Sequence, residues 1–213
     1  MADEPDVVDV DLEPWAPHAL AAGFEIEDAH VRDADLTGAH AAGGRIARSR
    51  LDAVRLASSR LRSIRLVDVI VSDSDLSNAD WTGARFVRVR FERCRMTGFK
   101  AASVDAEHVT FRGCKLDLAT FNQARVRRAT FDDCVLDDAD LSAATFRDTR
   151  FPQSRLRRTL IDEARLAGVD FRGCELEPAG DVHALRGAIV DLVQLVELGP
   201  LLARGIGIDV REA

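Results

Sequence analysis

The sequence repeats every five residues, and this period constrains the fold more than any other feature. Stepping by five from Leu36 to Leu176 meets 29 consecutive apolar residues without an insertion. The position two residues earlier, from Ala34 to Cys174, is nearly always small and never charged. This period matches neither the 3.6-residue period of a helix nor the two-residue period of a strand. The chain must therefore turn a corner every five residues, with both repeated positions inward.

Several units share a sequence as well as a period. Residues 34–38, 79–83 and 139–143 read AlaAspLeuThrGly, AlaAspTrpThrGly and AlaAspLeuSerAla. They resemble the A(D/N)LXX pattern of the pentapeptide-repeat family. The resemblance implies an all-β solenoid, a right-handed quadrilateral β-helix of pentapeptide repeats with four units per coil. We expect an acidic N-terminal segment over residues 1–23, this β-helix over 24–178, and a C-terminal cap with a short α-helix over 179–213.

Residues twenty apart support four units per coil. One column of inward positions is leucine with a single methionine, and another is largely phenylalanine. Stacked coils of this kind form a rod roughly 35 Å long, with rings in offset contact along the phenylalanine column. The predicted core includes Leu76, Met96, Leu116 and Leu136 in the first column, Phe91, Phe111, Phe131, Phe151 and Phe171 in the second, and the small inward residues Cys94, Cys114 and Cys134.

Charge is distributed unevenly along the chain. The net charge is −7, but residues 1–28 hold nine acidic residues and no Lys or Arg. Residues 31–180 hold 26 basic and 22 acidic residues, so the repeats themselves are slightly basic. No stretch approaches the roughly 20 apolar residues of a membrane-spanning helix, and the acidic start does not match a signal peptide. We expect a cytoplasmic protein with reduced cysteines.

Both ends of a solenoid need caps. Val8, Val10 and Leu12 alternate with Asp9 and Asp11, which predicts a short strand, and Trp15, Leu20 and Phe24 are candidates to plug the first coil. Near the C-terminus, Asp191 is a good N-cap for a helix through Leu198. Gly199 and Pro200 are expected to end it, with another turn over residues 201–204.

The C-terminal segment is apolar on more than one side. One side can cover the last coil, and a second is left for another copy of the chain. Residues 190–194 resemble the C-terminal cap of the Qnr and MfpA quinolone-resistance groups, which dimerise there. The candidate homodimer interface is Leu192, Val193, Leu195, Val196, Leu198, Leu201 and Leu202.

No chemistry-bearing motif stands out. The cysteines occupy one inward line, which favours packing over a tetrahedral metal site. The five carboxylates of residues 132–140 fall on three sides of the coil, where pairing with Arg157 and Arg158 one coil later is favoured over calcium binding. The five histidines are scattered, and no phosphate-binding loop is present. We expect no catalytic residue, metal or cofactor, and hence no enzyme.

One side of the coil is rich in arginine. Its outward positions carry only four acidic residues, Asp68, Asp105, Glu107 and Asp148. This side is either ordinary solvated surface or a docking strip for an acidic protein or nucleic acid. The arginines are Arg45, Arg48, Arg65, Arg85, Arg88, Arg125, Arg127, Arg128, Arg147 and Arg165.

The resemblance also implies a function. The Qnr and MfpA groups mimic DNA and bind DNA gyrase or topoisomerase. That role needs a continuous acidic strip, for which Asp117, Asp137 and Asp138 are the candidate residues outside the N-terminal segment. The first hypothesis is thus a dimeric protein that binds gyrase or topoisomerase. The alternatives are a scaffold that docks an acidic protein through its arginines, and weak nucleic-acid binding.

Overall fold

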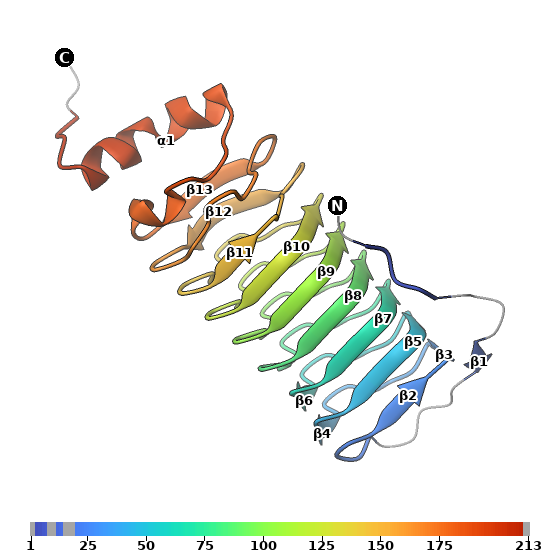
Figure 1. The fold of residues 1–213 in the computed structure, drawn as a ribbon. Coiled ribbons are helices and arrows are strands. Elements are labelled where there is room, and N and C mark those ends of the chain that lie inside the picture. Colours follow the sequence, from blue (N-terminus) through green and yellow to red (C-terminus); the bar gives the residue numbers. More distant parts are fainter. Residues whose placement is uncertain (1–2, 8–11, 15–19, 211–213) are drawn as a thin grey trace.

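The computed structural model describes residues 3–7, 12–14 and 20–210. These residues form a parallel β-solenoid of stacked four-sided coils with one helix at its C-terminal end, as Figure 1 shows, which confirms the predicted fold class. Each side of the coil is named here by its inward centres. The first face has Leu36 to Leu176, the second Ala41 to Ile161, the arginine-rich face Ile46 to Leu166, and the fourth Leu51 to Phe171.

The described strands lie where the repeat predicts extended chain. A strand that starts on the arginine-rich face continues past the corner onto the fourth face in most coils. The strands are β1 (Glu13–Pro14), β2 (Glu25–Glu27), β3 (Ala29–Arg32), β4 (His40–Ala42), β5 (Arg45–Asp52), β6 (Arg60–Arg62), β7 (Arg65–Ser72), β8 (Arg85–Glu92), β9 (Asp105–Arg112), β10 (Arg125–Asp132), β11 (Thr145–Arg147), β12 (Arg155–Leu160) and β13 (Glu175–Ala179).

The pairs that these strands form are all parallel. The largest sheet has the order β1-β3-β5-β7-β8-β9-β10-β11, with β2 also paired to β5. Two smaller sheets pair β4 with β6 and β12 with β13, the latter with one register shift near the cap. Residues twenty apart face each other, as Phe91 and Phe111 do between β8 and β9. This register confirms the 20-residue coil.

The corners explain the five-residue period. Every fifth residue from Gly23 to Gly173 has a positive φ, between 43° and 79°. Only eight of these residues are glycine, and none is Val, Ile or Thr. Branching at Cβ is poorly tolerated in this left-handed region, so the corners select unbranched side chains. Leu118 obeys the rule and is 59% exposed, because a corner side chain points outward.

The interior is filled by the predicted columns. All the core residues proposed from the sequence are buried. Consecutive phenylalanines from Phe91 to Phe171 stack with ring centroids 4.7–5.1 Å apart and planes within 10° of parallel. This separation matches the spacing of stacked strands, so the same twenty-residue register serves the backbone and the rings.

At the N-terminal end, Leu20 and Phe24 are partly buried against the core, as expected of a plug. The predicted strand at Val8 and Val10 and the plug residue Trp15 lie outside the described residues. The described strand here is β1, whose Glu13 pairs with Ala29 of β3.

The C-terminal end differs from the expectation in one respect. Helix α1 (Leu192–Gly205) continues through Gly199 and Pro200, and a short 3₁₀ helix, η1 (Val182–Leu185), precedes it. Proline removes one backbone hydrogen bond, to the carbonyl four residues earlier. That residue is Val196, which is 71% exposed, so water can satisfy its carbonyl. The described helices include none long and apolar enough to cross a membrane.

The start of α1 also closes the coil. Asp191 and Gln194 form a reciprocal capping box, in which each side chain accepts from the other's backbone N–H at 3.0 and 2.9 Å. The Gln194 amide then donates to the carbonyls of Phe171 (2.6 Å) and Cys174 (2.7 Å) in the last coil. Gln194 is buried, so these bonds satisfy carbonyls that no further coil would reach.

Candidate binding face

The arginine-rich face divides into two sets of five arginines. Ion pairs with described residues engage Arg45, Arg48, Arg88, Arg127 and Arg128. The other set makes no ion pair with any described residue, and its members are all exposed. It consists of Arg65, Arg85, Arg125, Arg147 and Arg165. The face therefore carries both satisfied and unsatisfied positive charge.

Most of the unpaired arginines share one line. The residues just before the centres, from Arg45 to Arg165, stack in register across β5, β7, β8, β9, β10 and β11. We call this line the arginine column. Its members are Arg45, Arg65, Arg85, Asp105, Arg125, Thr145 and Arg165.

Arginines lie directly beside arginines in this column. Arg65 faces Arg45 on one side and Arg85 on the other. Neighbouring strands lie about 4.8 Å apart, and like charges directly opposite each other are destabilising. The column's single carboxylate, Asp105, lies 3.3 Å from Arg127, outside the column. Arg65 therefore lies between two arginines, and Arg85 lies between Arg65 and Asp105, a carboxylate that already pairs with Arg127.

The corner between the arginine-rich and fourth faces shows the opposite pattern. Asp28, Arg48, Asp68, Arg88, His108, Arg128 and Asp148 occupy it in successive coils and mostly alternate in charge; we call them the corner ladder. Arg48 donates two hydrogen bonds of 2.7 Å to Asp28, and Arg88 donates two of 2.6 and 2.7 Å to Asp68. This geometry is bidentate, the stronger form of an Arg–carboxylate pair.

Carboxyl pKa values along the ladder reflect this pairing. Hydrogen bonding to Arg48 lowers the pKa of Asp28. For Asp68, burial alone would raise the pKa. Hydrogen bonds from Arg88 and from the backbone N–H of Asp6 outweigh burial and lower it. Asp28 and Asp68 are therefore charged at neutral pH and neutralised by Arg48 and Arg88 within the ladder.

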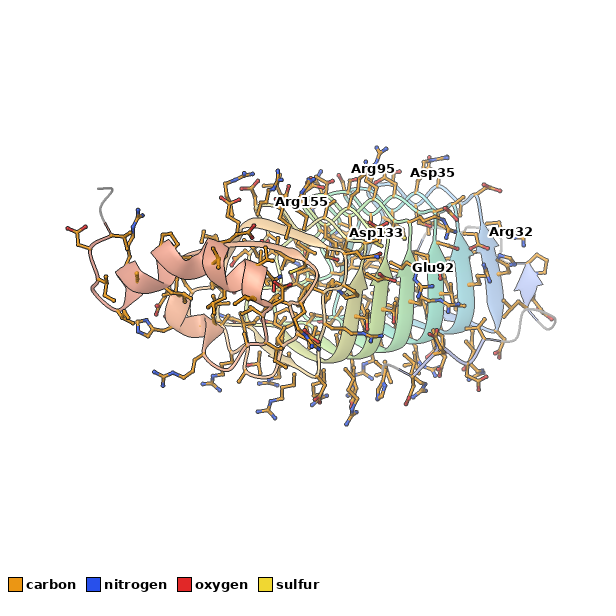
Figure 2. All side chains as sticks on the ribbon, turned by 90° about the horizontal axis from the view of Figure 1, so that it is seen from above. Arg32, Asp35, Glu92, Arg95, Asp133 and Arg155 are labelled. Atoms are coloured by element: carbon orange, nitrogen blue, oxygen red, sulfur yellow. The ribbon has the colours of Figure 1, made fainter. Side chains whose placement is uncertain are left out.

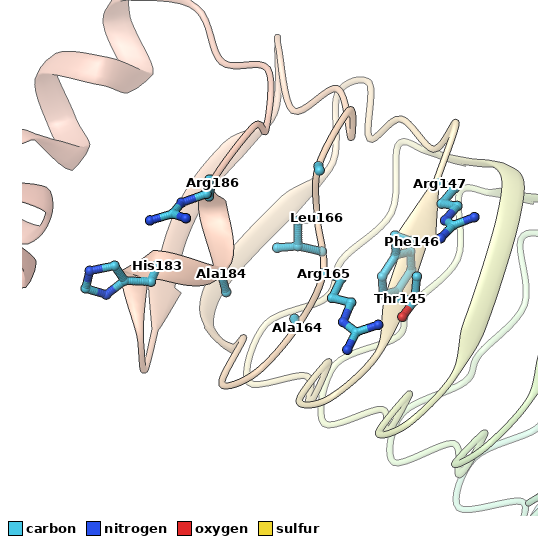
Figure 3. A pocket seen from close by; sticks show the side chains of 10 residues that line it. Thr145, Phe146, Arg147, Ala164, Arg165, Leu166, His183, Ala184 and Arg186 are labelled. Atoms are coloured by element: carbon cyan, nitrogen blue, oxygen red, sulfur yellow. The ribbon is translucent and has the colours of Figure 1, made fainter.

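The arginine-rich face ends in a hollow next to the C-terminal cap. Figure 3 shows Arg147, Arg165, Arg186 and His183 around a cavity of about 330 Å³. Arg147 and Arg165 belong to the face predicted from the sequence. Arg186 was missed because the five-residue phase breaks after Leu176. The positive surface thus continues into the cap.

The candidate acidic residues each have a partner among the described residues. Asp137 lies 2.7 Å from Arg155, Asp138 lies 2.6 Å from Arg158, and Asp117 accepts a hydrogen bond from Thr97. The predicted pairing of Asp138 with Arg158 is confirmed. The other predicted pair is wrong, because Arg155 reaches Asp137 and the Arg157 side chain turns to Glu175 instead.

Three residues on the fourth face combine a hydroxyl, a carboxylate and an imidazole. The Ser72 hydroxyl donates to Asp52, and His30 lies 2.6 Å from the other oxygen of the same carboxylate. A catalytic triad needs the imidazole between the hydroxyl and the carboxylate, so that it can accept the hydroxyl proton. Here the carboxylate stands between them and Ser72 is buried, so this group supports structure rather than nucleophilic chemistry.

The cysteines are buried, as predicted. Burial raises the pKa of the Cys174 thiol to about 12, so it stays protonated and weakly nucleophilic. Among the residues that the structure describes, no group of three or more His, Cys, Asp or Glu side chains could hold a metal ion.

The candidate dimer residues lie on two sides of α1. Leu198 is buried against the last coil, and Leu201 and Leu202 pack against the core. The other four point to solvent: Leu192, Val193, Leu195 and Val196 are 75%, 68%, 47% and 71% exposed. The structure thus separates a capping side from an uncovered apolar side.

Comparisons with known proteins address the fold. A family model described as a pentapeptide repeat region matches residues 104–180, and one described as pentapeptide repeats (8 copies) matches residues 65–100. No curated protein sequence matches the chain.

Solved structures that match are also repeat proteins. Two are trypsin-treated variants of QnrB1, a plasmid-mediated fluoroquinolone resistance protein. One is 15% identical and covers 89% of this chain and 99% of its own, with a TM-score of 0.50. The other is 20% identical and covers 89% and 91%, with a TM-score of 0.51. HetL, involved in heterocyst differentiation regulation in the cyanobacterium Nostoc sp., is 20% identical over 80% of this chain and 88% of its own, with a TM-score of 0.36.

Proposed function

The chain belongs to the pentapeptide-repeat proteins, and on that premise we propose that it is a non-enzymatic binding protein that docks an acidic partner protein along the arginine column. The observation that carries this proposal is the in-register position of Arg65 beside Arg85, both exposed and without an ion pair to any described residue. Asp105, the next residue in the column, is already paired with Arg127. An acidic partner supplies the missing charge.

The chemistry of the column suits carboxylates. A guanidinium binds a carboxylate through two parallel hydrogen bonds, and hydrogen bonds to charged groups contribute about 1.5–3 kcal/mol each. A ligand carboxylate beside Arg65 and Arg85 also removes their mutual repulsion. The proposal places the protein and its partner in the cytoplasm, a reducing compartment in which the cysteines of this chain remain thiols.

A titration with labelled poly-L-glutamate at low salt tests this proposal. We expect Arg85→Glu with Arg125→Glu to weaken binding by at least about a hundredfold, since two charge-assisted contacts are lost. Arg60→Glu with Lys100→Glu is the matched control, because both residues are exposed on the second face and the change in charge is the same. Equal loss in both variants would show that only net charge matters and would refute the arginine column as the site.

A parallel titration with a short DNA duplex separates a protein partner from nucleic acid. Nucleic-acid binding weakens steeply with salt because counterions are released from the phosphates. If the duplex binds the arginine column more tightly than poly-L-glutamate and shows this steep dependence, the partner is nucleic acid and the proposed partner class is wrong.

A second candidate function is modulation or protection of DNA gyrase or topoisomerase, the role that DNA mimicry serves in the Qnr and MfpA groups. Its support is the fold shared with QnrB1 over nearly the whole solenoid. Against it stands the pairing of Asp137 and Asp138 with arginines. A supercoiling assay with purified gyrase, with and without a quinolone, tests it. Inhibition or drug protection supports this function, and no effect removes it.

We also propose that the uncovered side of α1 forms a homodimer interface. Leu192, Val193 and Val196 expose adjacent apolar side chains that a second copy would cover. Sedimentation should give a dimer for the wild type and a monomer for Val193→Glu with Val196→Glu. Leu118→Glu, at an exposed corner of the coil, is the matched control and should leave the dimer intact. A monomeric wild type would refute the interface.

A further inference from the structure

The N-terminal residues contact the middle of the rod rather than its first coil. Residues 3–7 lie beside the ends of β8 and β9, as the dark blue segment of Figure 1 shows. The Asp3 N–H donates to His108 Nδ1 at 2.8 Å, although 105 residues separate them in the chain. We call residues 3–7 the arm. Its position was not predicted, because no local pattern signals a contact over this separation.

Each contact of the arm falls on a different coil. The Asp3 carboxylate lies 3.4 Å from His108 on β9, and the Glu4 carboxylate lies 2.7 Å from Arg90 on β8. The Asp6 N–H donates to Asp68 on β7 at 3.1 Å. The arm thus crosses three consecutive coils along the corner ladder.

The spacing fits an extended peptide laid parallel to the rod axis. Three residues separate Asp3 from Asp6, and an extended chain rises about 3.3 Å per residue, or roughly 10 Å in all. Two coils separate β9 from β7, also about 10 Å at the strand spacing. The alternation of exposure supports this conformation, since Pro5 and Val7 are partly buried while Glu4 and Asp6 are exposed.

The surface under the arm recognises backbone as well as charge. Arg90 is 26% exposed and supplies a guanidinium for Glu4, although it also lies 3.1 Å from Glu92. Hydrogen bonding to Asp68 raises the pKa of Arg88, with further attraction to Asp3 and Asp6. Asp68 and His108 accept hydrogen bonds from backbone N–H groups. The strip therefore binds carboxylates and peptide N–H donors together.

We propose that the strip formed by Asp68, Arg88, Arg90 and His108 is a docking site for an extended acidic peptide segment of a partner protein, and that the arm is its resident occupant. Nucleic acid does not match this site, because phosphates offer no N–H to Asp68 and its carboxylate repels them. The strip shares no residue with the arginine column, so this proposal stands apart from the proposed function.

The test uses the full chain with a neutralised arm, Asp3→Asn, Glu4→Gln and Asp6→Asn, and a labelled peptide of residues 1–8. A tethered arm competes at an effective concentration of about millimolar. The peptide should therefore bind the neutralised variant at least about tenfold more tightly than the wild type. Equal affinity for both proteins would show that the arm does not occupy the strip, and no binding to either would overturn the site.

Charge reversal on the strip locates the peptide. Adding Arg90→Glu to the neutralised variant should abolish peptide binding, whereas adding Arg60→Glu, on the second face, should leave it unchanged. Equal loss in both variants would contradict the strip, as would binding of a DNA duplex in preference to the peptide. Arg85→Glu with Arg125→Glu should not alter the affinity for the peptide. The proposal for the strip and the proposal for the arginine column are therefore tested independently.

Discussion

The first face and the arginine-rich face place opposite charge patterns at the same position of the repeat, just before each centre. On the first face, Asp35, Arg55, Asp75 and Arg95 alternate in sign in four successive coils, before Lys115 follows Arg95. Figure 2 shows Asp35, Arg95 and Arg155 along one edge of the rod. On the arginine-rich face, arginine follows arginine from Arg45 to Arg85, before Asp105 interrupts the column. The two faces share the same coil backbone and register. The fold therefore allows charges to alternate at this position, and the like charges on the arginine-rich face are not a requirement of the fold.

Where charges alternate on the first face, neighbouring residues form ion pairs that lower carboxyl pKa values. Arg55 lies 3.1 Å from Asp35. Hydrogen bonds from the Thr37 hydroxyl and N–H, together with Arg55, lower the pKa of Asp35 to about 2. We therefore interpret the adjacent, unpaired Arg65 and Arg85 as surface that a ligand completes.

The largest effect on stability should come from the stacked phenylalanines of the interior, which hold the coils of both faces in register. Phe131→Ala removes a ring that stacks on two others and should lower the free energy of unfolding by about 3–5 kcal/mol. Chemical denaturation measures it, and Leu118→Ala, exposed at a corner, should change it by less than about 0.5 kcal/mol. Unchanged stability in Phe131→Ala would contradict the stacked interior.

This interior was predictable from the sequence, because an inward position repeats its environment every coil and tolerates only apolar residues. Phe111 and Phe131 were placed correctly on that basis. Outward positions carry less information. Whether Asp137 pairs with Arg155 or Arg157 depends on side-chain reach, which a period cannot specify.

The ends of the chain were predicted less well for a related reason. Asp191 was identified from its capping chemistry, but the helix beyond Pro200 depends on the solvent exposure of one carbonyl. The contact of Asp3 with His108 depends on a fold that only long-range register creates. The acidity of residues 1–28 does not specify which coils residues 3–7 contact.

A smaller effect on stability is expected when the alternating charges of the first face are changed to a run of like charges. Asp75→Arg puts a third arginine in line between Arg55 and Arg95 and removes two hydrogen bonds from Ser77. The free energy of unfolding should fall by about 1 kcal/mol, and affinity for poly-L-glutamate should rise. Asp75→Asn, which can keep the turn hydrogen bonds, should show neither change. Loss of stability without a gain in affinity would contradict the link between like charge and ligand binding.

A still smaller effect on stability should distinguish an arginine of the arginine column from an arginine on the first face. Arg65→Gln removes a repulsive neighbour of both Arg45 and Arg85 and should raise the free energy of unfolding by about 0.2–0.5 kcal/mol at low salt. Arg55→Gln removes an attractive neighbour of Asp35 and should lower it slightly. Both differences should vanish at high salt. A decrease for Arg65→Gln would mean that the column is satisfied without a ligand.

The smallest effect is the response to acid. Because the folded pKa of Asp35 lies below its unfolded value of about 3.9, its contribution is present above that value and is lost as pH falls toward 2. Melting curves of wild type and Asp35→Asn should therefore differ at pH 7 and converge at low pH. Arg65→Gln should show no such convergence, since arginine does not titrate in this range and the in-register neighbours of Arg65 are both arginines.

The most direct test of the arginine column is the shift in melting temperature that poly-L-glutamate produces at low salt. A ligand that binds only the folded state stabilises it by about 2.7 kcal/mol at a concentration one hundred times its Kd. The wild type should melt at a clearly higher temperature in saturating poly-L-glutamate, and Arg85→Glu with Arg125→Glu should not shift. Equal shifts in the two proteins, or none in either, would contradict the assignment of the column as the binding surface.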